Sequence, residues 1–310
     1  MATLEARAEV RADTASARLA RFAARTPLHF VLIGVAVLWI VPTLGLLITS
    51  FRHRPDISAT GWWHAIFHWH WTLHNYGLVL HAQNLHIGKA WVNSLIITVP
   101  ATLLPLIIGA LAAYGFAWVP FPFRDTIFLV VIALMIIPIQ TSLVPLLKLF
   151  RHVPLLGWNL VTPHFGIDQF SFVGIWLAHT AFGLPLAIFL LRNFFITLPK
   201  DLIEAARMDG ASNLAIFSRV VIPLSVPALA SFAIFQFLWV WNDLLMALVF
   251  VPNPADQPLT VRIPSLLSTY GQEYHLLSAA AFLLMFLPLI VFFALQRYFV
   301  QGLLAGSVKT

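Results

Sequence analysis

The sequence contains no cysteine and very little charge. None of its 310 residues is a cysteine, which excludes disulfides, thiolate metal sites and cysteine nucleophiles. Charged residues make up 10% of the chain and hydrophobic residues 60%, with a mean hydropathy of +0.88. Soluble domains carry about a quarter charged residues. The composition therefore indicates an integral membrane protein, in which the net charge of +6 bears on orientation rather than on nucleic-acid binding.

The sequence also lacks the residues that an enzyme or a self-sufficient ATPase would need. The Gly88-Lys89 pair is followed by alanine and has no upstream P-loop glycine. The apolar segments contain no paired carboxylates, no nucleophile–base set and no HExxH motif, so we expect no catalytic residue, no cofactor and no metal. They hold one acid, Asp243, and no lysine or arginine away from their ends, which disfavours an ion-coupled carrier. The energy for any transport must then come from another chain.

Six apolar segments are long enough to cross a bilayer as helices, which takes about 20 residues each. Prolines inside them are tolerated in membrane helices, because neighbouring helices can satisfy the freed carbonyls. We therefore predict an all-α integral membrane protein with six transmembrane helices. The predicted spans are His29–Phe51, Asn93–Val119, Thr126–Phe150, Phe172–Leu191, Val226–Val251 and Leu276–Phe299.

The distribution of basic residues predicts that both termini are cytoplasmic. With the N-terminus inside, the inner segments hold twelve of the 18 lysines and arginines and the outer segments six. The first span is too long and starts too late to be a cleaved signal peptide. The predicted division is a basic cytoplasmic arm (1–27), a first transmembrane helix (28–51), an extracytoplasmic loop rich in histidine and tryptophan (52–88), a transmembrane domain (89–298) and a cytoplasmic tail (299–310).

One polar, helix-forming stretch interrupts the apolar segments on the predicted cytoplasmic side. It reads LPKDLIEAARMDGASN, over residues 198–213. Pro199 stands where the first turn of a helix begins, and Gly210 where a left-handed residue would end it. Ser212 or Asn213 can cap a second short helix. The pattern predicts two short helices joined by a tight glycine turn, with a solvated connecting loop as the alternative.

This stretch resembles the EAA loop of permease subunits in binding-protein-dependent ABC importers. The matching residues are Glu204-Ala205-Ala206, then Gly210 four residues later, then the ending Ile222-Pro223-Leu224, where Pro223 would stop the second helix. The segments MDGAS, WNDLL and LQRYFVQGLLAGSVK are similar to the smaller, six-span permease of carbohydrate importers of the maltose-transporter type. The resemblance covers residues 89–309 and is weakest in the arm before Thr26 and in the histidine-rich loop.

The resemblance implies a type I ABC importer permease bundle with an EAA coupling loop over 198–224. In that family the first helix of the loop docks in a cleft of the ATPase subunit. The implied partners are a second permease subunit, two ATPase subunits and an extracytoplasmic solute-binding protein, in the lipid bilayer of a bacterial inner membrane. The residues implied to form the ATPase-coupling surface are Glu204, Ala205, Ala206, Arg207, Asp209 and Gly210.

Polar and aromatic side chains at membrane depth are candidates for the solute path. Trp241, Asn242 and Asp243 lie in the outward half of the fifth predicted span, and Asn93 opens the second. Amide, carboxylate and aromatic groups suit a sugar, whose hydroxyls need partners and whose ring faces can stack. Alternatively, neighbouring helices satisfy these same groups. The expected solute is an oligosaccharide, a disaccharide or a related polyol, with glycerol phosphate as an alternative.

The predicted outer loop contains seven histidines. His64 and His68, and likewise His70 and His74, are four residues apart, so each pair would share a helix face and could bind zinc. Without cysteine or clustered carboxylates, a metal site and a metal-ion permease are the weaker alternative. A segment at the membrane surface fits better, since tryptophan is favoured at headgroup level. Its tryptophans are Trp62, Trp63, Trp69 and Trp71.

Overall fold

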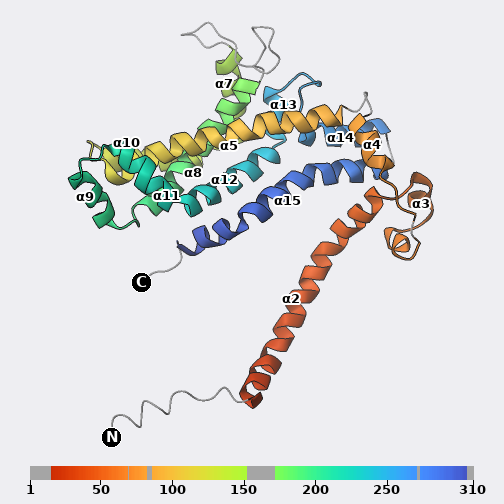
Figure 1. Ribbon diagram of the computed structural model, residues 1–310. Coiled ribbons are helices and arrows are strands. Elements are labelled where there is room, and N and C mark those ends of the chain that lie inside the picture. Colours follow the sequence, from red (N-terminus) through yellow and green to blue (C-terminus); the bar gives the residue numbers. More distant parts are fainter. Residues whose placement is uncertain (1–14, 69, 82–85, 152–171, 271–272, 306–310) are drawn as a thin grey trace.

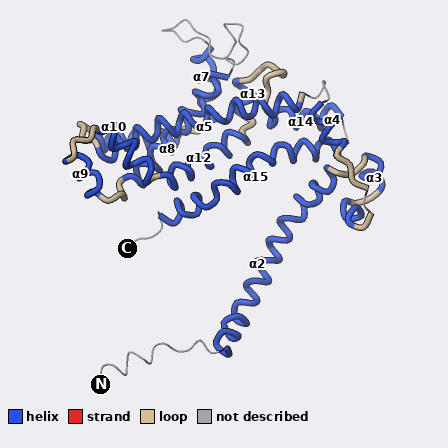
Figure 2. The backbone as a smooth tube through the Cα atoms, viewed as in Figure 1, coloured by secondary structure: helices blue, strands red, loops and turns tan. Residues whose placement is uncertain are grey.

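The chain folds into helices joined by loops. The structure, a computed structural model, describes residues 15–68, 70–81, 86–151, 172–270 and 273–305 (Figure 1). Within these ranges the secondary structure is helical, apart from one isolated bridge between Arg52 and Trp71 (Figure 2). This confirms the predicted all-α fold class. Residues 1–14 of the predicted arm, 306–310 of the predicted tail and the loop residues 152–171 lie outside the described part.

Four long helices run side by side and form the body of the molecule (Figure 1). They are α5 (Ile87–Trp118), α8 (Val173–Phe195), α12 (Val226–Trp241) and α15 (Tyr274–Ala305). The pair α5 and α8 forms the most extensive contact. Small residues permit it, because a Cβ added at Gly109 of α5 would lie 2.5 Å from the Cβ of Ala187 in α8. Close packing of small residues is a main source of helix association in lipid.

The first long helix, α2 (Ala15–Ser50), leaves the body at an angle (Figure 1). It includes the predicted first span and begins inside the predicted arm. Between Leu28 and Leu44 its side chains are exposed on all sides of the helix. Near its C-terminal end it packs on the outer loop, where Gly45 lies against Trp62. A helix that is apolar all round needs lipid or another protein around it.

The number of membrane spans depends on how two bent helix pairs are counted. In the described residues, four helices are long and apolar enough to cross a membrane, and the number rises to six if each bent pair is one span. The prediction of six spans therefore agrees only under that second count. The straight candidates are Thr26–Ser50, Ile87–Trp118, Val173–Phe195 and Tyr274–Tyr298; the bent pairs are Arg124–Ile136 with Ile139–Phe150, and Asn213–Leu224 with Val226–Trp241.

The third predicted span is broken in the middle. The helix α6 (Arg124–Ala133) ends in a 3₁₀ turn (Leu134–Ile136), and α7 (Ile139–Arg151) then leaves at an angle of 102°. Pro138 cannot donate a backbone hydrogen bond, and it favours an extended conformation for the preceding residue. Ile137 has that conformation, with φ −69° and ψ 118°. The predicted span over 126–150 is therefore a bent helix pair, and it counts as one span only in that form.

The fifth predicted span is also divided. It begins after a 78° bend at Ser225, runs as α12 to Trp241, and resumes as α13 (Leu245–Phe250) after three non-helical residues. A span over 226–251 was expected because the segment is long and mostly apolar, with Asn242 and Asp243 as its one adjacent pair of strongly polar residues. These two polar residues stand at the break.

Several short helices lie at the two ends of the body (Figure 1). The polar loop lies at the same end as the C-terminal end of α15, and it contains α9 (Lys200–Met208), α10 (Asn213–Ile216) and α11 (Ile222–Leu224). At the opposite end lie α3 (Arg54–Ala59), the 3₁₀ helix Trp62–Ile66, α4 (His74–His81) and α14 (Leu259–Tyr270). The polar loop and the histidine-rich loop therefore lie at opposite ends of the body, separated by the length of the long helices.

Candidate coupling loop and solute path

The polar stretch folds as two short helical segments, as predicted. Ser212 Oγ accepts a hydrogen bond from the Ala215 amide at 3.2 Å and caps the second segment. Pro199 precedes the first helix instead of lying in its first turn, and Pro223 does not stop the second, because the chain bends only at Ser225. The first segment is α9 (Lys200–Met208); the second comprises α10 (Asn213–Ile216), a π-helical turn (Phe217–Val221) and α11 (Ile222–Leu224).

The turn between the two segments depends on Gly210. Its φ is +79°, the left-handed conformation that the sequence predicts and that side chains with a Cβ rarely adopt. The Gly210 amide donates to the Arg207 carbonyl, and the Ala211 amide to the Ala206 carbonyl, both at 3.0 Å. These two bonds form a Schellman motif, which satisfies carbonyls that the end of α9 would leave unpaired.

One side of α9 attaches the loop to the body of the molecule. Ile203 is buried in a cluster with Ile216 and with Phe195 at the end of α8. Arg207 donates through Nη2 to the Trp118 carbonyl at 2.8 Å, at the end of α5. Arg207, which the sequence assigns to the coupling surface, therefore also joins α9 to α5. These contacts join α9 to the ends of two long helices.

The other side of α9 is an exposed face, which we call the α9 face. It consists of Asp201, Glu204, Ala205 and Met208, which are spaced so that they share one side of the helix. Met208, which the sequence analysis did not select, is 87% exposed. In the described part of the chain, no salt bridge to Glu204 is formed. Ala206, by contrast, is half-buried on the inner side. An exposed methionine beside an unpaired acid suits contact with another protein.

Asp243 stands at the break between α12 and α13. Its Oδ2 accepts hydrogen bonds from the amides of Met246 at 3.0 Å and Ala247 at 3.3 Å. Its backbone carbonyl accepts from Thr260 Oγ1 at 2.9 Å, on α14. The carboxylate thus caps α13, and it competes with the helical hydrogen bonds that would have joined α12 to α13. Sequence reasoning identified this residue but not its role in ending the helix.

The two residues before Asp243 point in different directions. Trp241 is 2% exposed, donates through Nε1 to the Leu284 carbonyl at 2.8 Å, and stacks on Phe237 with ring centroids 5.7 Å apart. Asn242 is exposed, and its Nδ2 donates to the Leu238 carbonyl at 2.8 Å. The Asn242 side chain is therefore open to its surroundings, whereas the Trp241 side chain is enclosed between α12 and α15.

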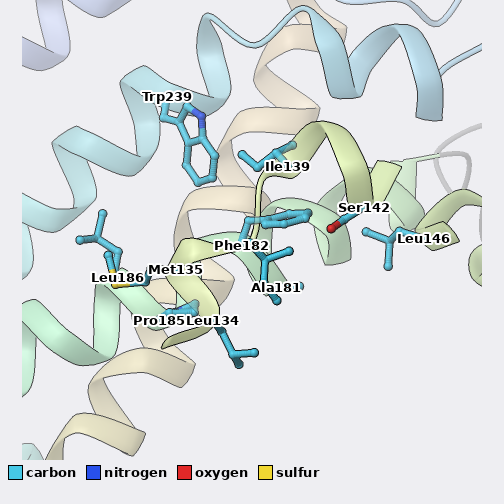
Figure 3. A pocket seen from close by; sticks show the side chains of 11 residues that line it. Leu134, Met135, Ile139, Ser142, Leu146, Ala181, Phe182, Pro185, Leu186 and Trp239 are labelled. Atoms are coloured by element: carbon cyan, nitrogen blue, oxygen red, sulfur yellow. The ribbon is translucent and has the colours of Figure 1, made fainter. Parts of the chain in front are cut away.

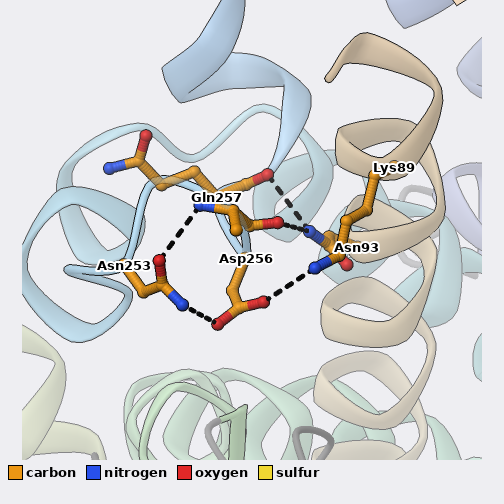
Figure 4. A network of polar contacts seen from close by, with 6 residues as sticks. Lys89, Asn93, Asn253, Asp256 and Gln257 are labelled. Carbon is orange, nitrogen blue, oxygen red and sulfur yellow. Dashed lines mark hydrogen bonds and ion pairs between the residues drawn. The ribbon is translucent and has the colours of Figure 1, made fainter. Parts of the chain in front are cut away.

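Asn93 belongs to a polar network that fastens the loop between α13 and α14 to α5 (Figure 4). Its Nδ2 donates to the carbonyls of Ala255 at 3.2 Å and Gln257 at 3.4 Å. One turn earlier, Lys89 forms a salt bridge with Asp256 at 3.3 Å. The Asn93 side chain is buried, so its amide is used within the protein in this arrangement.

A groove that sequence reasoning missed is lined by a different set of residues. It has a volume of about 410 Å³ and is bounded by the α6–α7 break, α8 and α12. Figure 3 shows Trp239 of α12 and Phe182 of α8 on its walls, with Ser142 of α7 at one edge. Trp239 lies two residues before the WND triplet that the sequence analysis selected. The sequence does not show that the Trp239 side chain faces the groove, because that depends on how α12 packs against α8 and the α6–α7 break.

The histidine-rich loop brings one of the two predicted pairs together. The rings of His64 and His68 are stacked with centroids 4.2 Å apart, and His68 Nδ1 lies 3.3 Å from the His64 carbonyl oxygen. Across the described ranges, no group of three or more histidine, cysteine or acidic side chains is placed to hold a metal ion. Trp69 lies outside the described residues, while Trp63 and Trp71 are exposed.

Comparison with known proteins identifies the family. Residues 105–304 match the model of the family described as "Binding-protein-dependent transport system inner membrane component". The match covers more than half of the chain, and the chain therefore belongs to this family of membrane transport components. This confirms the relationship that the EAA loop indicates.

Individual relatives cover most of the chain. The osmoprotective compounds uptake permease protein GgtD of Synechocystis sp. is 49% identical over 94% of this chain and 95% of its own length. The alpha-glucoside transport system permease protein AglG of Rhizobium meliloti is 53% identical over 77% of this chain, which spans 60% of AglG. The melibiose/raffinose/stachyose import permease protein MelC of Bacillus subtilis is 35% identical over 89% of this chain and 93% of MelC.

Solved structures confirm the fold. A chain from the crystal structure of a bacterial ABC transporter that imports the acidic polysaccharide alginate matches with a TM-score of 0.69 and 22% identity, over 90% of this chain and 98% of that chain. A second alginate transporter structure, in complex with an alginate pentasaccharide-bound periplasmic protein, matches with a TM-score of 0.64 and 14% identity over 90% of this chain and 96% of that one. The fold is thus that of an ABC importer permease.

Proposed function

We propose that this chain is the transmembrane permease subunit of an ATP-driven sugar importer in a bacterial inner membrane, with both termini in the cytoplasm. It forms half of the translocation path and hydrolyses no ATP itself. Its partners are a second permease subunit, two ATPase subunits and an extracytoplasmic binding protein. The observation that carries the proposal is the exposed α9 face. The opposite side of α9 packs against the ends of α5 and α8, and the sequence has no nucleotide-binding motif.

The geometry of α9 supports a coupling role. Glu204 can pair with a basic residue of the ATPase subunit, and Ala205 allows a close helix–protein approach. Met208 adds an adaptable apolar contact. Because Arg207 and Ile203 attach α9 to the long helices, a movement of the ATPase would reach the transmembrane body through this helix. Asp209 and Gly210 complete the surface by fixing the turn.

The solute is proposed to be a neutral sugar of disaccharide or oligosaccharide size, or a related polyol glycoside. Relatives are named as permeases for alpha-glucosides, for melibiose, raffinose and stachyose, and for osmoprotective compounds. Asn242 and Asp243 supply polar groups at the α12–α13 break, as part of the proposed path. Trp241 and Asn93 hold the helices that form the path in place, since their side chains are buried and hydrogen-bonded within the protein.

Reconstitution tests the proposal. The chain is purified with its two ATPase subunits and second permease, placed in proteoliposomes, and supplied with binding protein and a panel of sucrose, trehalose, maltose and melibiose. We expect at least one sugar to raise ATP hydrolysis severalfold and to accumulate inside. A complex whose hydrolysis responds to a divalent metal ion and to none of the sugars would contradict the proposed solute class.

A further inference from the structure

A histidine that the proposed function does not use lies buried beside the solute path. His179, on α8, is 1% exposed, and its two ring nitrogens have no hydrogen-bond partner in the described part of the chain. A buried polar group without a partner is costly, and such groups in folded proteins call for an explanation. His179 Nε2 lies 3.6 Å from Asp243 Oδ2, just beyond hydrogen-bonding distance.

A small cavity occupies the space around this pair. Its volume is about 10 Å³, and its polar lining residues are Ser94, Thr98, His179 and Asp243. A space of this size admits about one water molecule, provided that two to four polar partners surround it. The lining supplies those partners. One water can therefore join the imidazole to the carboxylate, and it would satisfy a nitrogen that is otherwise unpaired.

On its other side His179 touches the wall of the groove. Its ring stands edge to face against the indole of Trp239, with centroids 5.9 Å apart and an interplanar angle of 86°. Trp239 in turn lines the groove together with Phe182 (Figure 3). His179 thus contacts both the indole that faces the groove and the carboxylate that sets the α12–α13 break.

The backbone around the groove argues that it faces protein, water or solute rather than lipid. The α6–α7 break, at Ile137 and Pro138, forms one wall. Non-helical backbone at membrane depth is tolerated where it is buried in protein or lines a water-filled cavity, but not against lipid. The groove volume lies within the range of about 300–1,000 Å³ that is typical of small-molecule sites. An indole face on its wall offers the stacking surface that a pyranose ring uses.

We propose that His179 is a positioning residue for solute passage: it holds the Trp239 indole toward the groove and the Asp243 carboxylate at the break, and the groove accepts a neutral pyranoside. This inference rests on the proposed function and adds to it the sugar-contacting wall of this subunit. His179 itself does not touch the sugar. Its effect is on how much sugar crosses for each ATP hydrolysed, because ATP hydrolysis depends on α9 at the far end of the body.

The test compares His179→Leu, His179→Gln and Thr180→Val in the reconstituted complex. Thr180 is the matched control, since it is the next residue on α8, is also buried, and its hydroxyl donates to the Trp176 carbonyl of its own helix. The readout is the ratio of sugar uptake to sugar-stimulated ATP hydrolysis, with the most effective of the four sugars as the probe. This ratio does not depend on the amount of complex recovered.

We expect His179→Leu to lower the ratio at least fivefold, His179→Gln to restore it to within about twofold of wild type, and Thr180→Val to leave it unchanged. An unchanged ratio in His179→Leu would overturn the inference. If His179→Leu does not assemble, Trp239→Leu decides the matter: a fivefold loss supports the inference and an unchanged ratio overturns it. Failure of the proposed function is distinguishable, because the wild-type complex itself would then show no sugar-stimulated hydrolysis.

Discussion

At the scale of single residues, the coupling loop depends on two side-chain properties. Glu204 is an exposed acid without a salt bridge in the described structure, and Gly210 is a residue whose backbone conformation excludes most side chains. Neither residue faces the long helices. Substitutions at these positions should therefore separate ATPase coupling from membrane insertion.

The first prediction concerns the charge of Glu204. Glu204→Lys should leave the amount of the chain in the membrane unchanged, weaken association with the ATPase subunits and abolish sugar-stimulated hydrolysis, because a basic partner group would now be repelled. Copurification of the ATPase and the hydrolysis rate measure this. Glu204→Gln, which removes the charge without reversing it, should give an intermediate loss. Full assembly and wild-type transport by Glu204→Lys would show that the loop is only a linker.

The second prediction concerns the turn. Gly210→Val forces a β-branched residue into a φ of +79°, which costs about 1–3 kcal/mol and should distort the position of α9. We expect normal membrane levels with reduced ATPase association. Gly77→Val is the control, since Gly77 has an ordinary helical φ, has no atom within 4 Å of an added Cβ, and lies at the opposite end of the molecule. Equal losses in both variants would argue against a special role for the turn.

At the scale of elements, hydrogen bonds fasten the end of α2 to α4. Asn75 of α4 is buried, and its Nδ2 donates to the carbonyls of Ser50 at 2.8 Å and Arg52 at 2.9 Å. The Ser50 hydroxyl also lies 2.8 Å from the Tyr76 hydroxyl. This end of α2 is therefore fixed, while the rest of the helix stands apart from the other long helices.

The third prediction follows from this attachment. Asn75→Ala leaves two carbonyls without their donor, at a cost of about 1–3 kcal/mol for each unsatisfied buried group. We expect a lower unfolding temperature in detergent and faster proteolysis of the loop between α2 and α4. Ser58→Ala serves as control, because the exposed Ser58 hydroxyl donates only to the Arg54 carbonyl of its own helix. Identical melting curves for both variants would refute the attachment.

The fourth prediction concerns the orientation of the two ends. Single cysteines in this cysteine-free chain at Lys200 and Trp63 should react with an impermeant maleimide from opposite sides of the membrane. Residue 200 should react from the cytoplasm and residue 63, which is 60% exposed, from outside. Asn253 is a second outer probe, because it is exposed whereas Asp256 is half-buried. Labelling of residue 200 in intact cells from outside would reverse the predicted topology.

At the scale of the whole molecule, this chain is proposed to be one part of a larger machine. The apolar surface of α2 requires lipid or another protein around it. The α9 face requires a partner in the cytoplasm under the proposed topology. No nucleotide motif supplies energy within the chain.

The fifth prediction is that the purified chain alone is inactive. In proteoliposomes it should neither accumulate sugar against a gradient nor hydrolyse ATP, since the residues for nucleotide binding are missing from its sequence. Uptake of a radiolabelled disaccharide measures this, with the complete complex as positive control. Concentrative uptake by the chain alone would contradict the proposed assembly.

The sequence by itself determined the features that depend on residue type and local spacing. Apolar runs indicate membrane helices whatever their neighbours are, and Gly210 and Ser212 form the turn and the cap by bonds within a few residues. The EAA motif is local in the same sense, and it was sufficient to indicate the family. What the pattern could not supply was which side of α9 faces outward, because that depends on where Ile203 packs.

Only the tertiary structure decided which distant residues meet. His179 and Asp243 are 3.6 Å apart although they belong to different helices, and Trp239 reaches the groove because α8 and the α6–α7 break lie opposite it. The helix breaks at Pro138 and Asp243 could not be predicted from the sequence either. Membrane helices tolerate proline and polar residues, so whether a helix breaks there depends on whether neighbouring elements satisfy the freed backbone groups. Local chemistry thus fixes the turns and caps, whereas the solute path depends on packing between helices far apart in sequence, which no short pattern contains.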